Sequence, residues 1–347
     1  MKILHSADIH LDAPFAGRTA EEAAFLRREL LAVPGKLADL CVSQQCDMVL
    51  LAGDLFDGAY SRESYRALYS ALERMAVPVF VSPGNHDYCG MESPWEREIW
   101  PDNVRVFTKE KIESVAVPGL DCRVYGAGYQ SMDCPGLLEG FRTAGNETYH
   151  IGLLHADPTQ GATPYCPLTS EQIKASGLAY LALGHVHKTG SFTEGRTLCA
   201  WPGCPMGRGY DETGEKGVFV VELSDSVRLD FVPLNTPRFY DLQTDIASWE
   251  ALLPPAGSDD FYRITLTGYG TGEPVQVPVG YSHLELRDET VPETDLWGTA
   301  GDDTLEGIYF GMLREAMDGK DEAQQRVIRL AAQISRQILD GQEVKLP

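Results

Sequence analysis

The chain has 347 residues, of which 43% are hydrophobic and 23% are charged, and its formal net charge is −22. A chain of this length and composition can bury a sizeable core in two domains, or in one large domain with an appendage. No run approaches the length of a membrane span and the opening MKILHSADIHLD lacks the features of a signal peptide, so the sequence predicts a cytoplasmic protein.

Short apolar runs indicate strands in the first 235 residues, and polar or helical stretches separate them. The earlier runs are continuously apolar, as in strands covered on both faces, whereas the later runs alternate as in sheets with one wetter face. This pattern predicts the α/β class, with two packed β-sheets flanked by helices. The expected strands are residues 2–8, 47–54, 77–84, 122–128, 150–157, 178–185, 197–203, 217–224 and 227–234.

Two segments between the first strands are expected to form helices. The first begins at a capping box, in which Glu22 follows Thr19 by three residues. Pro34 and Gly35 are expected to break or kink this helix. The second helix spans residues 61–75 and carries its apolar residues on one face.

The composition changes after about residue 236. Residues 241–319 contain sixteen Asp and Glu, three Arg and no Lys, whereas a protein that binds nucleic acid is expected to carry a basic stripe. An alternating strand at 260–270 and an amphipathic helix at 321–341 are expected in this part of the chain. The predicted parts are residues 1–236, a small α+β unit at 237–303 and a C-terminal helical segment at 304–347.

Polar side chains gather where the predicted strands end, and the two histidines in LALGHVHK illustrate the pattern. A spacing of two brings their side chains to the same side only if the backbone is extended. Sites in open α/β sheets form at the carboxyl ends of strands, so we expect the polar residues of five strand ends to meet at one edge of one sheet. These residues are Asp8, His10, Asp54, Asp57, Asn85, His86, Asp87, His155, His185 and His187.

Carboxylates, an amide and imidazoles without a thiolate suit manganese, iron, zinc or magnesium. Seven of the residues are too many ligands for one ion but suffice for two ions that share a carboxylate, and Asp54 is the natural bridge because it follows a central strand. Each residue alone also has an ordinary structural explanation, as a turn residue or as a core histidine such as His5. The seven candidate ligands are Asp8, His10, Asp54, Asn85, His155, His185 and His187.

The motifs DxH, GDxxD, GNHD, H and GHxH occur in this order between residues 8 and 187, and the series resembles the metallophosphoesterase superfamily. The stretches LHSADIHLD, LLAGDLFDG and GRGYDETGEKGVFVVEL further resemble the SbcD-like and YhaO-like DNA repair exonucleases. The resemblance implies two divalent ions, with Mn²⁺ expected before Mg²⁺, Fe²⁺ or Zn²⁺. It assigns one ion to Asp8, His10, Asp54 and His187, and the other to Asp54, Asn85, His155 and His185.

The resemblance also implies roles for residues that hold no metal. His86 would donate to a phosphate oxygen or protonate the leaving group. Asp57 would orient His86, unless it is a simple turn aspartate. Archaeal and eukaryotic relatives have a histidine at the position of Asp57, so the chain is similar to the SbcD branch there. Arg208, in PMGRGYDE, is either a substrate-binding residue or an ordinary solvated side chain.

The leading hypothesis is therefore a two-metal phosphodiesterase that acts on DNA, as an exonuclease or endonuclease of double-strand-break repair, with residues 1–236 as its catalytic domain. The alternative is a metallophosphoesterase for a nucleotide, a cyclic nucleotide or a phosphoprotein, and a third hypothesis is a non-catalytic scaffold.

By the same resemblance, the expected partners are DNA and an SMC-like ATPase. Basic residues near the first motif, among them Arg27 and Arg28, are candidate DNA contacts, and a dimer or the ATPase would supply the rest. The C-terminal helix either binds the ATPase or docks onto its own domain. Its apolar stripe consists of Val327, Leu330, Ile334 and Ile338.

Overall fold

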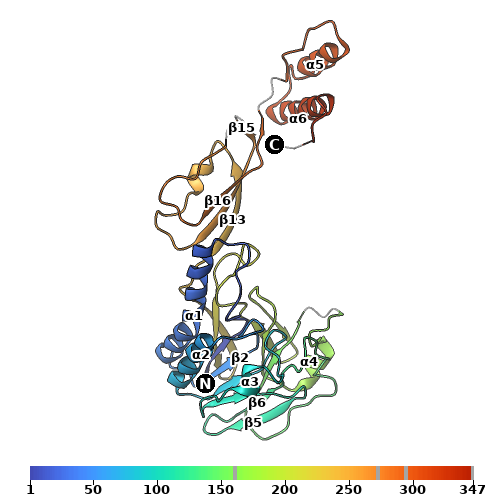
Figure 1. Ribbon diagram of the computed structural model, residues 1–347. Helices are drawn as coiled ribbons and strands as arrows, with labels where there is room; N and C mark the ends of the chain where they lie inside the picture. Colours follow the sequence, from blue (N-terminus) through green and yellow to red (C-terminus); the bar gives the residue numbers. More distant parts are fainter. Residues whose placement is uncertain (159–161, 271–273, 293–295, 345–347) are drawn as a thin grey trace. The chain divides into compact units, whose positions relative to one another are not determined.

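The computed structural model describes residues 1–158, 162–270, 274–292 and 296–344 (Figure 1). The chain divides into two compact units, Met1–Phe239 and Tyr240–Pro347. All candidate site residues belong to the first unit, so its architecture decides which of them meet. The expectation that residues 1–236, 237–303 and 304–347 form three separate parts stays a prediction.

The first unit contains two six-stranded sheets. The first sheet consists, in spatial order, of β12 (Val227–Pro233), β11 (Gly217–Leu223), β1 (Lys2–Ser6), β2 (Met48–Leu51), β3 (Val79–Val81) and β4 (Val104–Val106). The second consists of β5 (Glu113–Val117), β6 (Cys122–Gly126), β7 (Tyr149–His155), β8 (Tyr180–Gly184), β10 (Thr197–Trp201) and β9 (Gly190–Glu194). Strands β1 to β4 are parallel in the first sheet, and β6, β7, β8 and β10 are parallel in the second.

The two sheets face each other across a shared core. Ile3, Leu50 and Phe80 of the first sheet pack in one buried cluster with Ile151 and Tyr180 of the second. The intervening residues of β7 and β8 enter another buried cluster on the opposite face of the second sheet. Alternate side chains thus enter different cores, which explains why these strands are apolar at nearly every position. The predicted class, two packed sheets flanked by helices, is confirmed.

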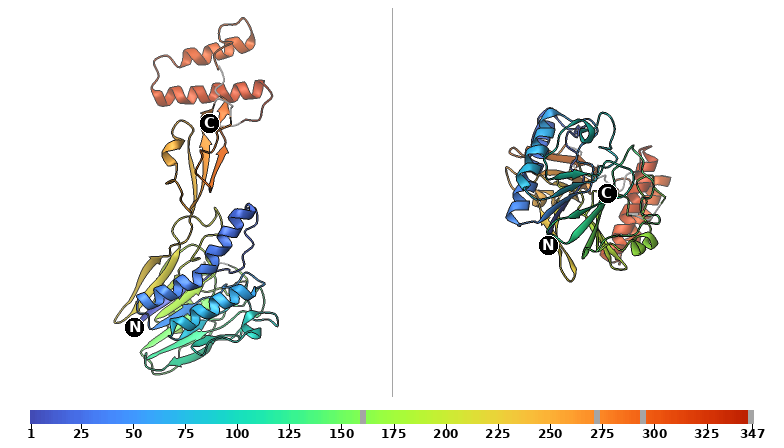
Figure 2. Two further views of the ribbon diagram at one scale, coloured as in Figure 1. Left: turned by 60° about the vertical axis from the view of Figure 1, so that its left-hand side comes forward. Right: turned by 90° about the horizontal axis from the view of Figure 1, so that it is seen from below.

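Helices α1 (Ala20–Ser43) and α2 (Arg62–Met75) lie side by side in the first unit (Figures 1 and 2). The predicted capping box of α1 is present, since Glu22 N donates to Thr19 Oγ1 and the Glu22 carboxylate accepts from Thr19 N. Of the break or kink expected at Pro34 and Gly35, the break is wrong, because α1 continues to Ser43. Pro34 lies on the buried side of the helix, where apolar contacts offset the one backbone hydrogen bond that proline cannot donate.

Three of the described strands of the first unit were not expected from the sequence, and all three lie at sheet edges. Strands β4, β5 and β9 are largely half-buried or exposed and lack the apolar runs that mark the central strands. An edge strand needs polar side chains toward solvent, so hydrophobicity does not reveal it. Two short helices were also not expected, α3 (Pro94–Arg97) and α4 (Ser170–Ser176).

The second unit combines small sheets with a pair of helices. A three-stranded sheet contains β13 (Phe239–Asp245), β14 (Phe261–Thr267) and β16 (Leu284–Asp288), and β15 (Tyr269–Gly270) pairs with β17 (Val291–Pro292). A 3₁₀ turn, η1 (Trp249–Leu252), precedes β14. Helices α5 (Leu305–Ala316) and α6 (Glu322–Leu339) pack through Phe310 and Ala332. The strand expected at 260–270 and the helix expected at 321–341 are therefore both confirmed, with boundaries that differ by a few residues.

Within the described residues, no helix has the length and apolar character that crossing a bilayer requires.

Candidate metal centre

The candidate site residues lie in loops that follow five parallel strands. Asp8 and His10 follow β1, Asp54 follows β2, and Asn85 follows β3. The other candidates follow or end β7 and β8 of the second sheet. The expectation of one edge of one sheet is therefore wrong, because the loops come from both sheets and meet where the two layers end. A site between two sheets receives side chains from two sides and can enclose its ligands more fully.

Three glycines allow these loops to approach closely. A Cβ atom on Gly84 would lie 2.3 Å from Asp54 Oδ1, and one on Gly53 would lie 2.6 Å from His155 Nδ1. A Cβ atom on Gly184 would lie 2.0 Å from the carbonyl oxygen of Ala52. These distances are shorter than any tolerable contact, so the glycines that directly precede Asp54, Asn85 and His185 are required by packing.

The backbone at the site is held in an unfavourable conformation. Asp8, His10 and Asp54 have φ angles of 52°, 54° and 51°, and His185 has a φ angle of 92°. Side chains other than glycine rarely adopt this left-handed region, where each residue costs about 1–3 kcal/mol. Strain of this kind persists only where the surrounding structure enforces it, and it marks the loops as built for the placement of their side chains.

The first group of converging ligand atoms comes from Asp8, His10 and His187. His10 Nδ1 lies 3.1 Å from Asp57 Oδ1, and His187 Nδ1 lies 2.6 Å from Glu212 Oε1. A carboxylate only accepts, so both Nδ1 atoms carry the proton and both Nε2 atoms present lone pairs. These two Nε2 atoms lie 3.2 Å apart, so their lone pairs converge on one place where a metal cation would stabilise them.

The second group contains Asp54, Asn85 and His155. His155 Nδ1 lies 2.8 Å from the carbonyl oxygen of Ala52, so its proton is on Nδ1 and its Nε2 atom again presents a lone pair. That Nε2 atom lies 3.0 Å from Asn85 Oδ1 and 3.3 Å from Asp54 Oδ2. Burial alone would lower the pKa of His155, but the carboxylates of Asp54 and Asp8 raise it to about 10. The position therefore attracts positive charge, as a cation site must.

Asp54 belongs to the second group and also lies within reach of the first. Its Oδ2 atom lies 3.8 Å from His10 Nε2 as well as 3.3 Å from His155 Nε2, and its side chain is almost fully buried. Asp8 also belongs to groups of both kinds, once with His10 and His187 and once with Asp54 and His155. This arrangement has the donor set and the shared carboxylate that two adjacent divalent ions require.

His185 is placed differently from the other candidate ligands. Its backbone N–H donates to both carboxylate oxygens of Asp8 at 3.1 Å. Its ring lies edge-on to the ring of His155, with 5.3 Å between the centres, and 4.7 Å from the ring of Tyr165. The converging groups found among the described residues do not include His185. It lies beside the second group, and its backbone also positions Asp8.

His86 and Asp57 form a pair at the edge of the site. His86 Nδ1 lies 2.9 Å from Asp57 Oδ1, the same oxygen that accepts from His10. These hydrogen bonds hold the pKa of Asp57 well below its usual range, and the hydrogen bond that His86 donates to Asp57 raises the pKa of His86. The imidazole of His86 is 42% exposed, whereas that of His10 is buried. His86 is thus an exposed side chain whose charged form is favoured by Asp57, although one of its nitrogens also lies near His10 and Asp54.

One functional residue was not recognised in the sequence, and it is Glu212. Its carboxylate accepts from His187 Nδ1, from Arg208 N at 2.8 Å and from Arg208 Nη2 at 2.9 Å. Arg208 Nη2 also lies 3.1 Å from His187 Nδ1, but both donors share the Glu212 carboxylate as their acceptor. Arg208 is engaged in this partly buried network, so the alternative of an ordinary solvated side chain is wrong, whereas its contact with substrate stays a prediction.

Asp87 was expected among the polar residues at the strand ends but without a role, and its carboxylate ties two of the site loops together. It accepts from the backbone N–H groups of Gly84 at 2.7 Å, Leu55 at 2.8 Å and Asp54 at 3.2 Å. Burial raises the pKa of Asp87 to about 7, even though the hydrogen bonds from Gly84 and Leu55 favour its charged form.

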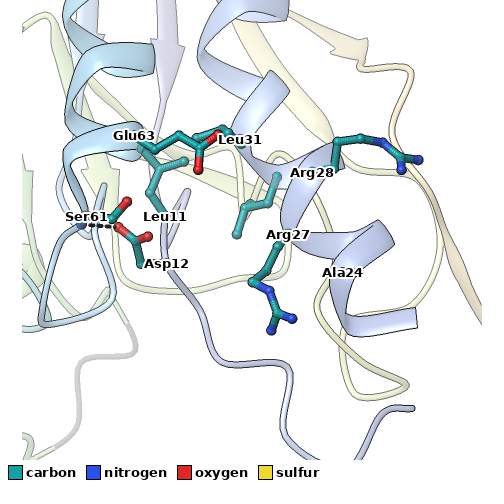
Figure 3. Close-up of a pocket in the computed structure, with 9 residues that line it drawn as sticks. Leu11, Asp12, Ala24, Arg27, Arg28, Leu31, Ser61 and Glu63 are labelled. Atoms are coloured by element: carbon teal, nitrogen blue, oxygen red, sulfur yellow. Dashed lines mark hydrogen bonds between the residues drawn. The ribbon is translucent and has the colours of Figure 1, made fainter. Parts of the chain in front are cut away.

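The basic residues near the first motif do not converge on a phosphate-sized site. A hollow of about 310 Å³ lies between α1 and the loop after His10. Figure 3 shows that Arg27 and Arg28 point away from one another, while Asp12 faces Ser61 and accepts from its backbone N–H at 2.9 Å. The described residues that line this hollow therefore form no cluster of positive charge.

The fold and the site together define a two-metal phosphoesterase. Residues 1–189 match the calcineurin-like phosphoesterase family, and the chain belongs to this family, whose members bind two divalent metals. The metallophosphoesterase YhaO of Bacillus subtilis is 34% identical over 363 residues, which cover 92% of this chain and 88% of YhaO.

Two further comparisons are more distant. A component of the nuclease SbcCD from Bacillus subtilis is 25% identical over 269 residues, which cover 64% of this chain and 66% of the relative. The crystal structure of TT1561 from Thermus thermophilus superposes with a TM-score of 0.42 at 15% identity, over 66% of this chain and 98% of that one.

The contact between Glu212 and His187 leads to a prediction. Glu212→Gln should weaken the affinity for one of two divalent ions by about 10–100-fold, because His187 loses the charged partner that fixes its ring and raises its basicity. Calorimetric titration of Mn²⁺ into metal-free protein measures this effect. Glu215→Gln, in the same loop but paired with Arg238, is the control and should bind as the unaltered protein does. Equal affinities in all three proteins would exclude the role of Glu212.

Proposed function

We propose that this protein is a two-metal phosphodiesterase whose substrate is DNA. The observation that carries the proposal is the carboxylate of Asp54, which lies within reach of both groups of converging ligand atoms. A second observation supports catalysis, since the exposed His86 lies directly beside this centre. The relative named as part of a nuclease aligns with 64% of the chain and supports DNA as the substrate.

The proposed ligand sets are those that the resemblance to the family implies, and the two converging groups support them in part. Asp8, His10, Asp54 and His187 would hold one ion, and Asp54, Asn85, His155 and His185 would hold the other. Oxygen donors mixed with imidazole suit Mn²⁺, which we propose as the native metal. When bound, two such ions lower the pKa of a water molecule and neutralise phosphate oxygens.

The chain itself would supply orientation and a proton. Asp57 holds His86 through Nδ1 at 2.9 Å, which leaves the Nε2–H group for an oxygen of the substrate. Because the pKa of His86 is raised by this contact, the imidazolium form needed for proton donation is favoured. Asp57 therefore acts as a positioning residue, and His86 as the residue that protonates the leaving oxygen.

A second candidate function has one observation in its favour. The net charge is −22, and the basic residues described near the first motif do not converge, so a long polyanion gains little attraction from the protein. A nucleotide, cyclic nucleotide or phosphoprotein would depend less on such attraction. A non-catalytic scaffold is disfavoured, because all seven candidate ligands and His86 are present.

The two functions are separated by an assay with Mn²⁺ that compares linear duplex DNA with bis(p-nitrophenyl) phosphate. We expect cleavage of both substrates. We also expect weak binding of a short duplex, with a slope of log affinity against log salt concentration that corresponds to about two to four phosphate contacts. Rapid cleavage of the small diester, with no binding of duplex DNA at low salt, would overturn DNA as the substrate.

We further propose that helix α6 binds a partner, with an SMC-like ATPase as the candidate by analogy with the complex to which the SbcCD relative belongs. In the structure α6 buries Ala332 and Gln333, whereas Val327 and Ile338 of its apolar stripe remain 66% and 60% exposed. These two residues of the stripe are thus left uncovered by the described part of the chain.

A double variant, Val327→Glu with Ile338→Glu, should abolish co-purification with a co-expressed SMC-like ATPase. Cleavage of the small diester should be unchanged, because both residues lie outside the first unit. Arg326→Glu on the same helix serves as the control for added negative charge. Unchanged co-purification would rule out this surface, and aggregation of the double variant would indicate that α6 docks onto its own chain.

A further inference from the structure

A hollow of about 570 Å³ opens beside His86. Two loops form it, one after β2 that contributes Tyr60 and one after β3 that contributes His86, Tyr88, Met91 and Arg97. The volume falls within the range of about 300–1,000 Å³ that is typical of small-molecule sites. Because the exposed imidazole of His86 is part of its wall, a group bound in this hollow would lie next to the reacting phosphate.

One wall of the hollow is aromatic and rigid. The hydroxyl of Tyr60 donates to Glu98 at 2.8 Å, and its ring lies 5.8 Å from the ring of Phe56. Phe56 in turn lies 5.7 Å from Trp95, which stacks on Trp100 with 5.0 Å between the ring centres. Tyr60 is therefore held in place by a packed aromatic layer and presents a preformed surface.

Two further lining residues are apolar but exposed. Met91 is 90% exposed and Tyr88 is also exposed, so two large side chains remain uncovered beside a reactive centre. A methionine adapts its shape to a flat ligand and makes favourable contacts with aromatic rings. Arg97 pairs with Glu92, so among the described lining residues the guanidinium offers little unbalanced charge for a second phosphate. Flat, uncharged and aromatic groups fit these walls best.

We propose that this hollow binds the nucleobase of the leaving nucleotide, which stacks on Tyr60 and Tyr88 and contacts Met91. The inference rests on the proposed function, in which His86 protonates the leaving oxygen, because that oxygen carries the departing nucleoside to the side of His86. Stacking on an aromatic face is tolerant of base identity, so the site would bind any of the bases without sequence preference. The hollow thus gives the enzyme a preference for nucleic acid over simple phosphate diesters without a basic groove.

Dinucleotides that lack one base test this site. With the Mn²⁺-loaded full chain, removal of the base on the leaving side should lower kcat/KM by at least about fivefold, the lower end of the effect of one stacked base. Removal of the base on the other side should have a smaller effect. Tyr88→Ala should bring the ratio of kcat/KM between the complete and the abasic dinucleotide close to one. The control is Met132→Ala, which alters an exposed methionine outside the hollow and should leave this ratio unchanged. Equal rates for all dinucleotides with the unaltered protein would overturn the proposal.

A binding measurement separates this site from the proposed function. Thymidine 5′-monophosphate should bind at least about fivefold more tightly than deoxyribose 5-phosphate in calorimetry, and Tyr88→Ala should remove the difference. If dinucleotides are not cleaved but bis(p-nitrophenyl) phosphate is, the nuclease function fails, and this binding difference alone supports the base site. Equal affinity of the two phosphates would overturn the base site even if DNA is cleaved.

Discussion

Asp54→Ala should remove both metal ions and abolish phosphodiesterase activity. Asp54 Oδ2 lies 3.3 Å from His155 Nε2 and 3.8 Å from His10 Nε2, so each ion would lose a ligand. The two ions would also lose the negative charge between them that offsets their mutual repulsion. Metal content of the purified protein, measured by mass spectrometry together with diester cleavage, tests this result.

The control for this prediction must separate metal loss from misfolding. Asp54 Oδ1 also accepts from the backbone N–H of His86 at 2.8 Å, so alanine removes a buried hydrogen bond as well. Asp54→Asn retains an acceptor for that contact but not the charge, and it should lose the ions while melting as one cooperative unit. Asp39→Ala, on the surface of α1, should keep both ions. Two ions at full occupancy in Asp54→Ala would refute the shared ligand.

The parts of the site that the sequence predicts are those encoded next to a strand end. Asp8, Asp54 and Asn85 each lie within a few residues of the carboxyl end of an apolar run, and parallel strands carry their carboxyl ends to a common edge. The preceding glycines add a second local signal, because each is needed for close approach of the loops. Local order along the chain was therefore enough to predict which side chains gather.

Contacts that depend on distant loops were not predictable in this way. Glu212 reaches His187 from 25 residues further along the chain, in a loop without periodicity that no strand end marks. Likewise, apolar runs reveal strands but not which of two sheets each strand joins, so the site was expected at one sheet and lies between two. The exposed edge strands were not predicted for a related reason, because they bury too little surface to require an apolar pattern.

The C-terminal helix illustrates the same limit. Its strong amphipathic pattern correctly predicted a helix, and α6 spans Glu322–Leu339. The pattern could not reveal which face would be covered, and the described structure buries Gln333, which accepts from the hydroxyl of Tyr269 at 2.6 Å, while Val327 stays exposed. Periodicity locates an apolar face, but the partner of that face is a tertiary or quaternary property.

His86→Ala should retain both metal ions and lower the turnover of DNA by about 10²–10⁴-fold, the usual contribution of a positioned proton donor. His86 already donates through Nδ1 to Asp57, and its imidazole is the exposed member of the cluster, so its loss should leave the buried ligands in place. Metal content and single-turnover cleavage of a short duplex measure the two parts of the prediction.

The leaving group then distinguishes a proton donor from a residue that only shapes the site. A p-nitrophenolate departs without protonation, whereas a nucleoside alkoxide does not, so His86→Ala should slow bis(p-nitrophenyl) phosphate much less than DNA. Asp57→Asn should also slow DNA cleavage more than cleavage of the small diester, but to a smaller extent. The substitution removes the Asp57 charge, which orients His86 and keeps the pKa of His86 raised. It should also loosen His10, which bonds the same oxygen, and so lower metal affinity where His86→Ala does not. Equal losses of activity on both substrates would make His86 a structural residue and not a proton donor. Loss of a metal ion from His86→Ala would make His86 a metal ligand, as the position of its nitrogen near His10 and Asp54 would then explain.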